Sequence, residues 1–161
     1  RKSLDLEPRE FALWANGFFY PLTETVLRLD GVPIKYMGDG FLWFFSGPNH
    51  RRRACDAAFL AMQLVGDQLR IGLSSGLIYV GAVGHPEYSR PDIMGQVVNI
   101  AFLTAGWAEK NARSGVAATA TVLEGVGPDF GTGVTEDVNF RDIASPVHVC
   151  ELVSGETSPE A

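Results

Sequence analysis

Apolar residues near the start of the chain recur every three or four positions, which is the spacing of one face of an α-helix. The positions that follow this repeat are Phe11, Leu13, Trp14, Phe18, Leu22, Val26 and Leu29. Asp5 is a suitable N-cap and Pro8 suits a first turn, so we expect the helix to begin near residues 6–10. Pro21 should kink or divide this helix.

The rest of the pattern alternates short strands with helices. We expect a hairpin over 32–45, a helix over 54–65, a strand pair at 69–75 and 77–83, a helix over 97–110, a short strand at 116–119, a helical turn near 120–125 and strands near 134–140 and 146–153. Short links between strands are typical of antiparallel sheets with helices packed on them, so the sequence predicts the α+β class. One domain is expected over 1–153, followed by a disordered tail over 154–161.

A Gly-Asp-Gly corner separates the two strands of the predicted hairpin. Glycine tolerates positive φ without a Cβ clash, so Gly38 and Gly40 suit a tight turn. This turn would fix the Asp39 carboxylate at the mouth of a sheet, where it would be a good hard-oxygen ligand for Mg²⁺ or Mn²⁺. An ordinary turn is the alternative, because Asp-Gly is a common hairpin dipeptide.

Four segments carry distinctive patterns of glycine and polar residues: KYMGDGF at 35–41, RIGLSSGLIYVGAVG at 70–84, DIMGQVVNIA at 92–101 and SPVHVCEL at 145–152. In this order they resemble elements of the class III nucleotidyl cyclase catalytic domain, the family of adenylate and guanylate cyclases. The resemblance covers nearly the whole chain. It implies a ferredoxin-like β-α-β-β-α-β core with a mostly antiparallel sheet, whose first strand would lie upstream of residue 1.

The resemblance also implies an activity. A class III cyclase converts a nucleoside triphosphate into the 3′,5′-cyclic monophosphate and pyrophosphate, with two divalent ions, Mg²⁺ or Mn²⁺, in each site. Asp39 matches one of the family's two metal-binding carboxylates, and we expect the other upstream of Arg1. The family's active site forms between two catalytic domains. We therefore expect a homodimer, with regulatory domains elsewhere in the full-length protein.

Two charged residues match the positions at which the family reads the base. Lys35 can only donate hydrogen bonds, and ionised Asp92 can only accept them. Adenine offers an acceptor at N1 and a donor at its 6-amino group, whereas guanine offers the reverse. The pair therefore predicts ATP as substrate and an adenylate cyclase that makes cyclic AMP. The alternatives are a surface lysine on a strand and a turn acid after Pro91.

Two further residues match catalytic positions of the family. Asn99 matches an asparagine that orients the ribose, and Arg141 stands where the family has a lysine that grips the triphosphate. A guanidinium can replace that ammonium and add bidentate contacts. Asn99 would otherwise cap a helix, and Arg141 would otherwise pair with Asp137 or Asp142 at the surface.

One position departs from the family pattern. The family has an arginine four residues after the asparagine, and this chain has Leu103. Loss of an oriented cation near developing charge typically lowers the rate by about 10² to 10³. The sequence thus leaves open a weak or inactive cyclase-homology domain that dimerises or senses nucleotide. An unrelated ferredoxin-like ligand-binding domain would explain the fold but not the ordered motifs.

The amino-acid composition limits the binding partners and the cellular location that we expect for this chain. A chain of 161 residues with 46% hydrophobic content fits one domain with a sizeable core. The formal charge of −6 argues against a nucleic-acid partner, and Arg51–Arg53 is expected to be a solvated patch before a helix. No apolar run reaches the roughly 20 residues of a membrane-spanning helix. Cys55 and Cys150 are expected to be buried free thiols, which suits a cytoplasmic location. The histidines show no metal-ligand spacing.

Overall fold

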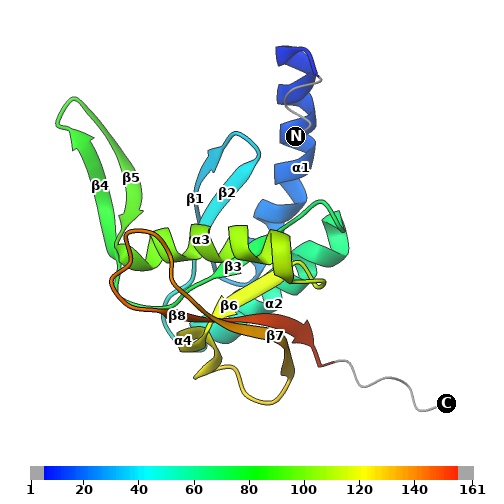
Figure 1. Ribbon diagram of the computed structural model, residues 1–161. Helices are drawn as coiled ribbons and strands as arrows, with labels where there is room; N and C mark the ends of the chain where they lie inside the picture. The colour runs from blue at the N-terminus through cyan, green and yellow to red at the C-terminus, as the bar shows by residue number, and fades with distance from the viewer. Residues whose placement is uncertain (1–5, 156–161) are drawn as a thin grey trace. The chain divides into compact units, whose positions relative to one another are not determined.

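The computed structural model describes residues 6–155, which form two units (Figure 1). The first unit contains the described residues up to Gly66 together with Gly81–Asp92, and the second contains Asp67–Val80 and the chain from Ile93 onward. The described residues contain four helices and sheets in which antiparallel pairing dominates. The predicted α+β class is therefore confirmed.

In the first unit, helix α1 (Pro8–Arg28) confirms the predicted helix. Leu22 and Val26 of the predicted apolar face are buried, whereas Leu13 is exposed. Its N-cap is Glu7, whose N–H donates a hydrogen bond to Glu10 Oε2 at 3.3 Å, and Pro8 occupies the first turn. The expected cap, Asp5, lies outside the described residues, and the observed cap shows that this prediction was wrong.

Pro21 lies inside α1 and does not divide it, so one of the two predicted effects of this proline, a division of the helix, is absent. Proline removes the donor for the carbonyl four residues earlier, which here belongs to Gly17. Gly17 is exposed, and no atom comes within 4 Å of the position its Cβ would take, so water can hydrate this carbonyl. In the next turn of the helix, the Thr25 hydroxyl donates to the Pro21 carbonyl at 2.8 Å. The helix therefore continues without an unsatisfied buried carbonyl at this turn.

Strands β1 (Val32–Met37) and β2 (Gly40–Phe44) form the predicted antiparallel hairpin. Met37 pairs with Gly40, which leaves Gly38 and Asp39 as a two-residue turn. Gly38 has a φ of +61°, whereas Gly40 does not take a positive φ. A glycine at the first central position is typical of a type II′ turn. The predicted turn is therefore confirmed, with Gly38 as the residue that needs the left-handed backbone.

Helix α2 (His50–Val65) begins four residues earlier than predicted. Arg51–Arg53 therefore belong to its first turn, so the prediction of a solvated patch before the helix was wrong. Arg53 lies 5.5 Å from the centroid of the Phe45 ring. Its guanidinium donates to the backbone carbonyls of Leu29, Asp30, Ser46 and Pro48. One side chain thus joins the chain segments on both sides of the β1–β2 hairpin.

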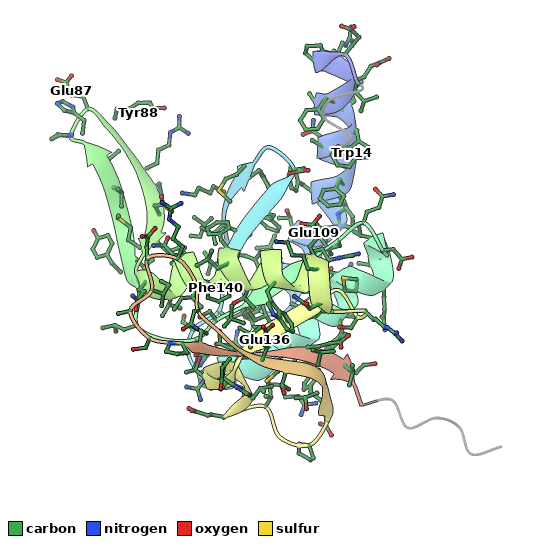
Figure 2. All side chains as sticks on the ribbon, in the orientation of Figure 1. Trp14, Glu87, Tyr88, Glu109, Glu136 and Phe140 are labelled. Atoms are coloured by element: carbon green, nitrogen blue, oxygen red, sulfur yellow. The ribbon has the colours of Figure 1, made fainter. Side chains whose placement is uncertain are left out.

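Strands β4 (Tyr79–His85) and β5 (Tyr88–Met94) form a second hairpin, whose tip carries Glu87 and Tyr88 (Figure 2). The predicted pairing of 69–75 with 77–83 was wrong, because β4 turns back through His85–Glu87 to pair with β5. His85 Nδ1 accepts the Glu87 N–H at 3.1 Å in this turn.

In the second unit, β3 (Ile71–Leu73), β6 (Val116–Thr119), β7 (Phe130–Val138) and β8 (Val147–Ser154) form a sheet with the order β3-β6-β8-β7. The β3–β6 pair is parallel, and β8 pairs antiparallel with β6 and with β7. Helix α4 (Ala120–Leu123) confirms the predicted turn after β6.

Helix α3 (Gln96–Asn111) lies over β3 and β6 of this sheet (Figure 1). Its contact with β3 depends on Gly72, because a Cβ there would lie 2.2 Å from the Ala105 amide nitrogen and 2.3 Å from the Ala101 carbonyl oxygen. Glycine thus allows the backbones of strand and helix to approach closely.

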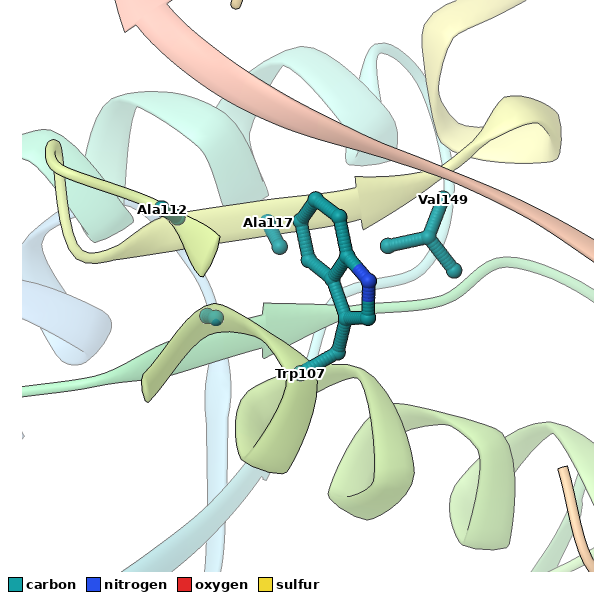
Figure 3. Close-up of a cluster of buried hydrophobic side chains, with 5 residues drawn as sticks. Trp107, Ala112, Ala117 and Val149 are labelled. Atoms are coloured by element: carbon teal, nitrogen blue, oxygen red, sulfur yellow. The ribbon is translucent and has the colours of Figure 1, made fainter. Parts of the chain in front are cut away.

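The core under α3 is built around Trp107, which is 6% exposed (Figure 3). Small side chains surround the indole, and Phe140 packs against the cluster (Figure 2). The buried members of this cluster are Trp107, Ala108, Ala112, Ala117 and Val149. The indole N–H donates to Glu136 Oε2 at 2.7 Å, so the large ring is buried without leaving its polar group unsatisfied.

Both cysteines are free and buried, as predicted. Burial, assisted by the neighbouring Asp56 carboxylate, raises the pKa of the Cys55 thiol to about 12. Burial also raises the pKa of Cys150. Within the described part of the chain, no helix is both long enough and apolar enough to cross a bilayer.

Candidate active site

Lys35 in β1 and Asp92 in β5 form an ion pair within the first unit, although they are 57 residues apart in the sequence. Lys35 Nζ donates to Asp92 Oδ2 at 2.8 Å. The structure thus brings together the two residues that the sequence marks as base readers. The ion pair is compatible with base reading and also with the alternatives left open by the sequence, a surface lysine on a strand and an acid after Pro91.

The contribution of this pair to stability is small. The side chains of Lys35 and Asp92 are 43% and 23% exposed, so water screens their attraction. Ion pairs of this kind contribute about 0 to 1 kcal/mol to folding. The pair therefore contributes little to the stability of the fold.

Asp39 lies in the two-residue turn of the same unit, four residues after Lys35, and is exposed. The structure confirms the predicted turn, whereas the role of the Asp39 carboxylate as a metal ligand stays a prediction. Among residues 6–155, however, no group of three or more His, Cys, Asp or Glu side chains is arranged to hold a metal ion. Asp39 is thus a single candidate ligand, and the described residues do not make a complete site for the two expected ions.

Asn99 belongs to the second unit and is the fourth residue of α3. The helix N-cap is Gly95, so Asn99 is not the cap that the alternative required. Gly95 has a φ of 151°, and a Cβ there would lie 3.1 Å from the Leu77 carbonyl oxygen. These constraints explain the glycine of the DIMGQVVNIA segment. Asn99 itself is exposed and lies in the first turn of the helix that begins after Gly95.

Arg141 also belongs to the second unit, in the segment between β7 and β8. Its side chain is 94% exposed, and its Nε lies 4.0 Å from Asp142 Oδ2. This is one of the two surface pairings that the sequence left open for it. The other named acid, Asp137, instead contacts His148 Nδ1 at 2.7 Å.

Leu103 is half-buried on α3, one turn after Asn99. Residues four apart on a helix lie on the same face. The position at which the cyclase pattern has an arginine therefore carries an uncharged side chain beside Asn99.

Tyr36, the residue after Lys35, was not singled out as a site residue by the sequence. Its ring stacks on Phe19 of α1, with centroids 4.4 Å apart, and its hydroxyl lies 2.6 Å from Thr23 Oγ1. The available signal was strand alternation, which puts Tyr36 and Lys35 on opposite faces of β1. That signal does not identify the partner of the tyrosine.

Comparison with curated proteins gives distant relatives. No model of a known protein family matches the chain. The uncharacterized protein Rv1319c of Mycobacterium tuberculosis is 32% identical over 93 residues, which are 52% of this chain and 17% of that protein. The uncharacterized protein Mb1354c of Mycobacterium bovis is 26% identical over 160 residues, which are 89% of this chain and 28% of that protein. The chain thus spans less than a third of the length of these relatives.

Comparison with solved structures is more informative about the fold. The guanylyl cyclase Cya2 matches with a TM-score of 0.79 and 21% identity, over 94% of this chain and 84% of that one. The adenylyl cyclase CyaB from P. aeruginosa matches with a TM-score of 0.78 and 18% identity, over 94% and 86%. The catalytic core of a rhodopsin-guanylyl cyclase with converted specificity, in complex with ATPαS, matches with a TM-score of 0.77 and 19% identity. This match covers 94% of this chain and 87% of that one. The chain has the fold of class III adenylyl and guanylyl cyclase catalytic domains.

Proposed function

We propose that this protein is the adenylate cyclase domain of a larger signalling protein and converts ATP into 3′,5′-cyclic AMP and pyrophosphate. In this reaction the ribose 3′-oxygen forms a bond to the α-phosphorus. The bond from the α-phosphorus to the bridging oxygen of the β-phosphate breaks, pyrophosphate leaves, and the 3′-hydroxyl loses its proton. The observation that carries the proposal is the contact of Lys35 with Asp92, in a fold shared with nucleotidyl cyclases.

Adenine would replace the contact between the two side chains. Lys35 would donate to N1, and Asp92 would accept from the 6-amino group. Each such contact contributes about 1–3 kcal/mol of discrimination, by analogy with the reading of base edges in nucleic acids. Because the structural neighbours include both adenylyl and guanylyl cyclases, the choice of ATP depends on these two residues.

Other residues are assigned from the family pattern. Asn99 would orient the ribose, and Arg141 would hold the triphosphate. Asp39 would supply one ligand to a Mg²⁺ or Mn²⁺ ion, which neutralises phosphate charge when bound. Since the described residues provide one such ligand and no complete set, we derive no step through a metal ion.

The proposed assembly is a homodimer in which one protomer supplies Asp39 and the other supplies Lys35, Asp92 and Asn99. The domain over 1–153, the regulatory domains of the full-length protein and its cytoplasmic location belong to the same proposal. The net charge of −6 argues against a nucleic acid as the partner.

The direct test is an assay of cyclic AMP formation by the full-length protein with ATP and Mn²⁺. Wild type should form cyclic AMP, and Asp39→Asn should not. Asp67→Asn is a matched control, because Asp67 is an exposed acid of the second unit outside the proposed machinery. No product from wild type, or undiminished product from Asp39→Asn, would contradict the proposal.

Leu103 favours a second candidate function. A cyclase-homology domain without the arginine would bind ATP or dimerise without turnover. It predicts saturable ATP binding by calorimetry, no cyclic AMP, and no gain of activity in Leu103→Arg. Measurable turnover by wild type would exclude it.

A further inference from the structure

An irregularity in β1 lies directly before Lys35. Pro33 pairs with Trp43, but Lys35 pairs with Leu42, so β1 contains one residue more than β2 between these pairs. An extra residue of this kind is a β-bulge, which bends a strand and redirects the side chains that follow. Because a shift of one residue exchanges the two faces of a strand, the ladder before the bulge does not determine which way Lys35 points.

After the bulge the ladder resumes, with Lys35 opposite Leu42 and Tyr36 opposite Phe41, and Tyr36 is also held by side-chain contacts, which we call the clamp. The Tyr36 ring stacks on Phe19 at 4.4 Å with an interplanar angle of 28°, and tilts against Phe41, its cross-strand partner, at 4.9 Å. Phe19 is 6% exposed and belongs to the core of α1. Tyr36 is thus held from two sides, by the helix and by the neighbouring strand.

The hydroxyl groups of Tyr36 and Thr23 add hydrogen bonds to this clamp, in which donor and acceptor can be assigned. Thr23 Oγ1 donates to the Phe19 carbonyl at 2.8 Å, and a threonine hydroxyl has one proton to give. In the contact of 2.6 Å between Thr23 Oγ1 and the Tyr36 hydroxyl, the tyrosine must therefore be the donor. Tyr36 donates to Thr23, which donates to the α1 backbone. Removal of the tyrosine hydroxyl breaks this chain at its first bond.

We propose that Tyr36 is a positioning residue for the base-reading lysine. Held against α1, Tyr36 fixes the rotation of β1 after the bulge, and Lys35 on the opposite face then points toward Asp92. Simple packing does not account for the arrangement, since Tyr36 is 51% exposed and still makes a directed hydrogen bond to α1. The inference rests on the proposed function, because its consequence is the choice between ATP and GTP.

The test compares nucleotide selectivity in the full-length protein. Tyr36→Phe keeps the ring and removes the donor, and Thr23→Val removes the acceptor. Each should lower the ratio of kcat/KM for ATP to that for GTP by about threefold to tenfold, the factor expected for one hydrogen bond. The double variant should lower it no further. Tyr20→Phe removes a hydroxyl from the same helix, where Tyr20 is 70% exposed, and should leave the ratio unchanged.

A purely structural role would reduce the two kcat/KM values equally, so an unchanged ratio in Tyr36→Phe and Thr23→Val would overturn the inference while the cyclase activity stands.

If the protein turns over neither nucleotide, the proposed function fails and the positioning role is read from unfolding in urea. The shifts in midpoint caused by Tyr36→Phe and by Lys35→Met should then not add in the double variant. Additive shifts would overturn the inference.

Discussion

The carboxylate of Glu151 occupies the space that a Cβ on Gly133 would need, at 2.2 Å from its Oε2. Glu151 is 5% exposed, and its two oxygens accept the backbone N–H groups of Ser114 at 2.8 Å and Val134 at 3.2 Å. A buried charge is thus held by main-chain donors, in the strand β8 that the closing SPVHVCEL motif forms.

Gly133→Ala should therefore destabilise the protein. The new methyl group would force Glu151 away from its donors, and a buried group left without a hydrogen bond costs about 1–3 kcal/mol. Urea unfolding followed by far-UV circular dichroism measures the effect. Gly17→Ala is the control, since Gly17 is an exposed helical glycine with open space around it and its replacement should be neutral or stabilising.

Glu151 should also make stability depend on pH. Burial opposes ionisation, but hydrogen bonds from Ser114, Val134 and Arg113 outweigh it and lower the pKa of Glu151 below the ordinary 4.5. A group with a depressed folded-state pKa contributes stability above its unfolded pKa and loses it as the pH falls through the folded value. The difference in urea midpoint between wild type and Glu151→Gln should therefore be constant above about pH 5.5 and shrink below pH 4.5. A difference that grows with acid would contradict this assignment.

Thr104 offers a change that should stabilise the fold. Its side chain on α3 is fully buried, and its hydroxyl has no hydrogen-bond partner among the described residues. Valine has nearly the same shape and no polar atom, so Thr104→Val should raise stability by about 1 kcal/mol. Thermal unfolding tests this expectation. A lower melting temperature would show that the hydroxyl has a partner, such as a buried water.

Leu103→Arg tests whether the missing cation limits the proposed reaction. An arginine one turn after Asn99 should raise kcat by about tenfold or more, because oriented cations typically contribute 10² to 10³ in rate. KM for ATP should change less than kcat, since charge develops on the transferring phosphate in the transition state. Leu103→Lys is a useful companion, because it restores charge without the planar guanidinium. An unchanged kcat in both variants would show that this position does not face the reacting phosphate.

Local patterns predicted most of the helices and strands. The helix α1, the Gly38 turn and the short strand β6 depend on neighbouring residues, and the structure confirms each of them. The partner of β3 was missed because it is β6, which comes much later in the chain, and local spacing carries no information about such pairing. The long reach of Arg53 across two loops was missed for the same reason.

The sequence identified some residues of the candidate site and missed others. The motif order identified Lys35 and Asp92, and the structure shows them in contact. Tyr36 was missed because its link to Thr23 joins two hydroxyl groups on different elements and leaves no periodic signal. The roles of Lys35 and Asp92 in reading the base stay predictions, as do those of Asn99, Arg141 and Asp39.

The most direct test of the account is the nucleotide preference of the Lys35→Glu/Asp92→Cys double variant of the full-length protein. These substitutions exchange donor for acceptor at the base edge, and the exposed pair contributes little to stability, so the variant should fold. We predict that its ratio of kcat/KM for ATP to that for GTP falls by at least about tenfold relative to wild type. An unchanged ratio in a folded, active variant would contradict the claim that Lys35 and Asp92 read adenine.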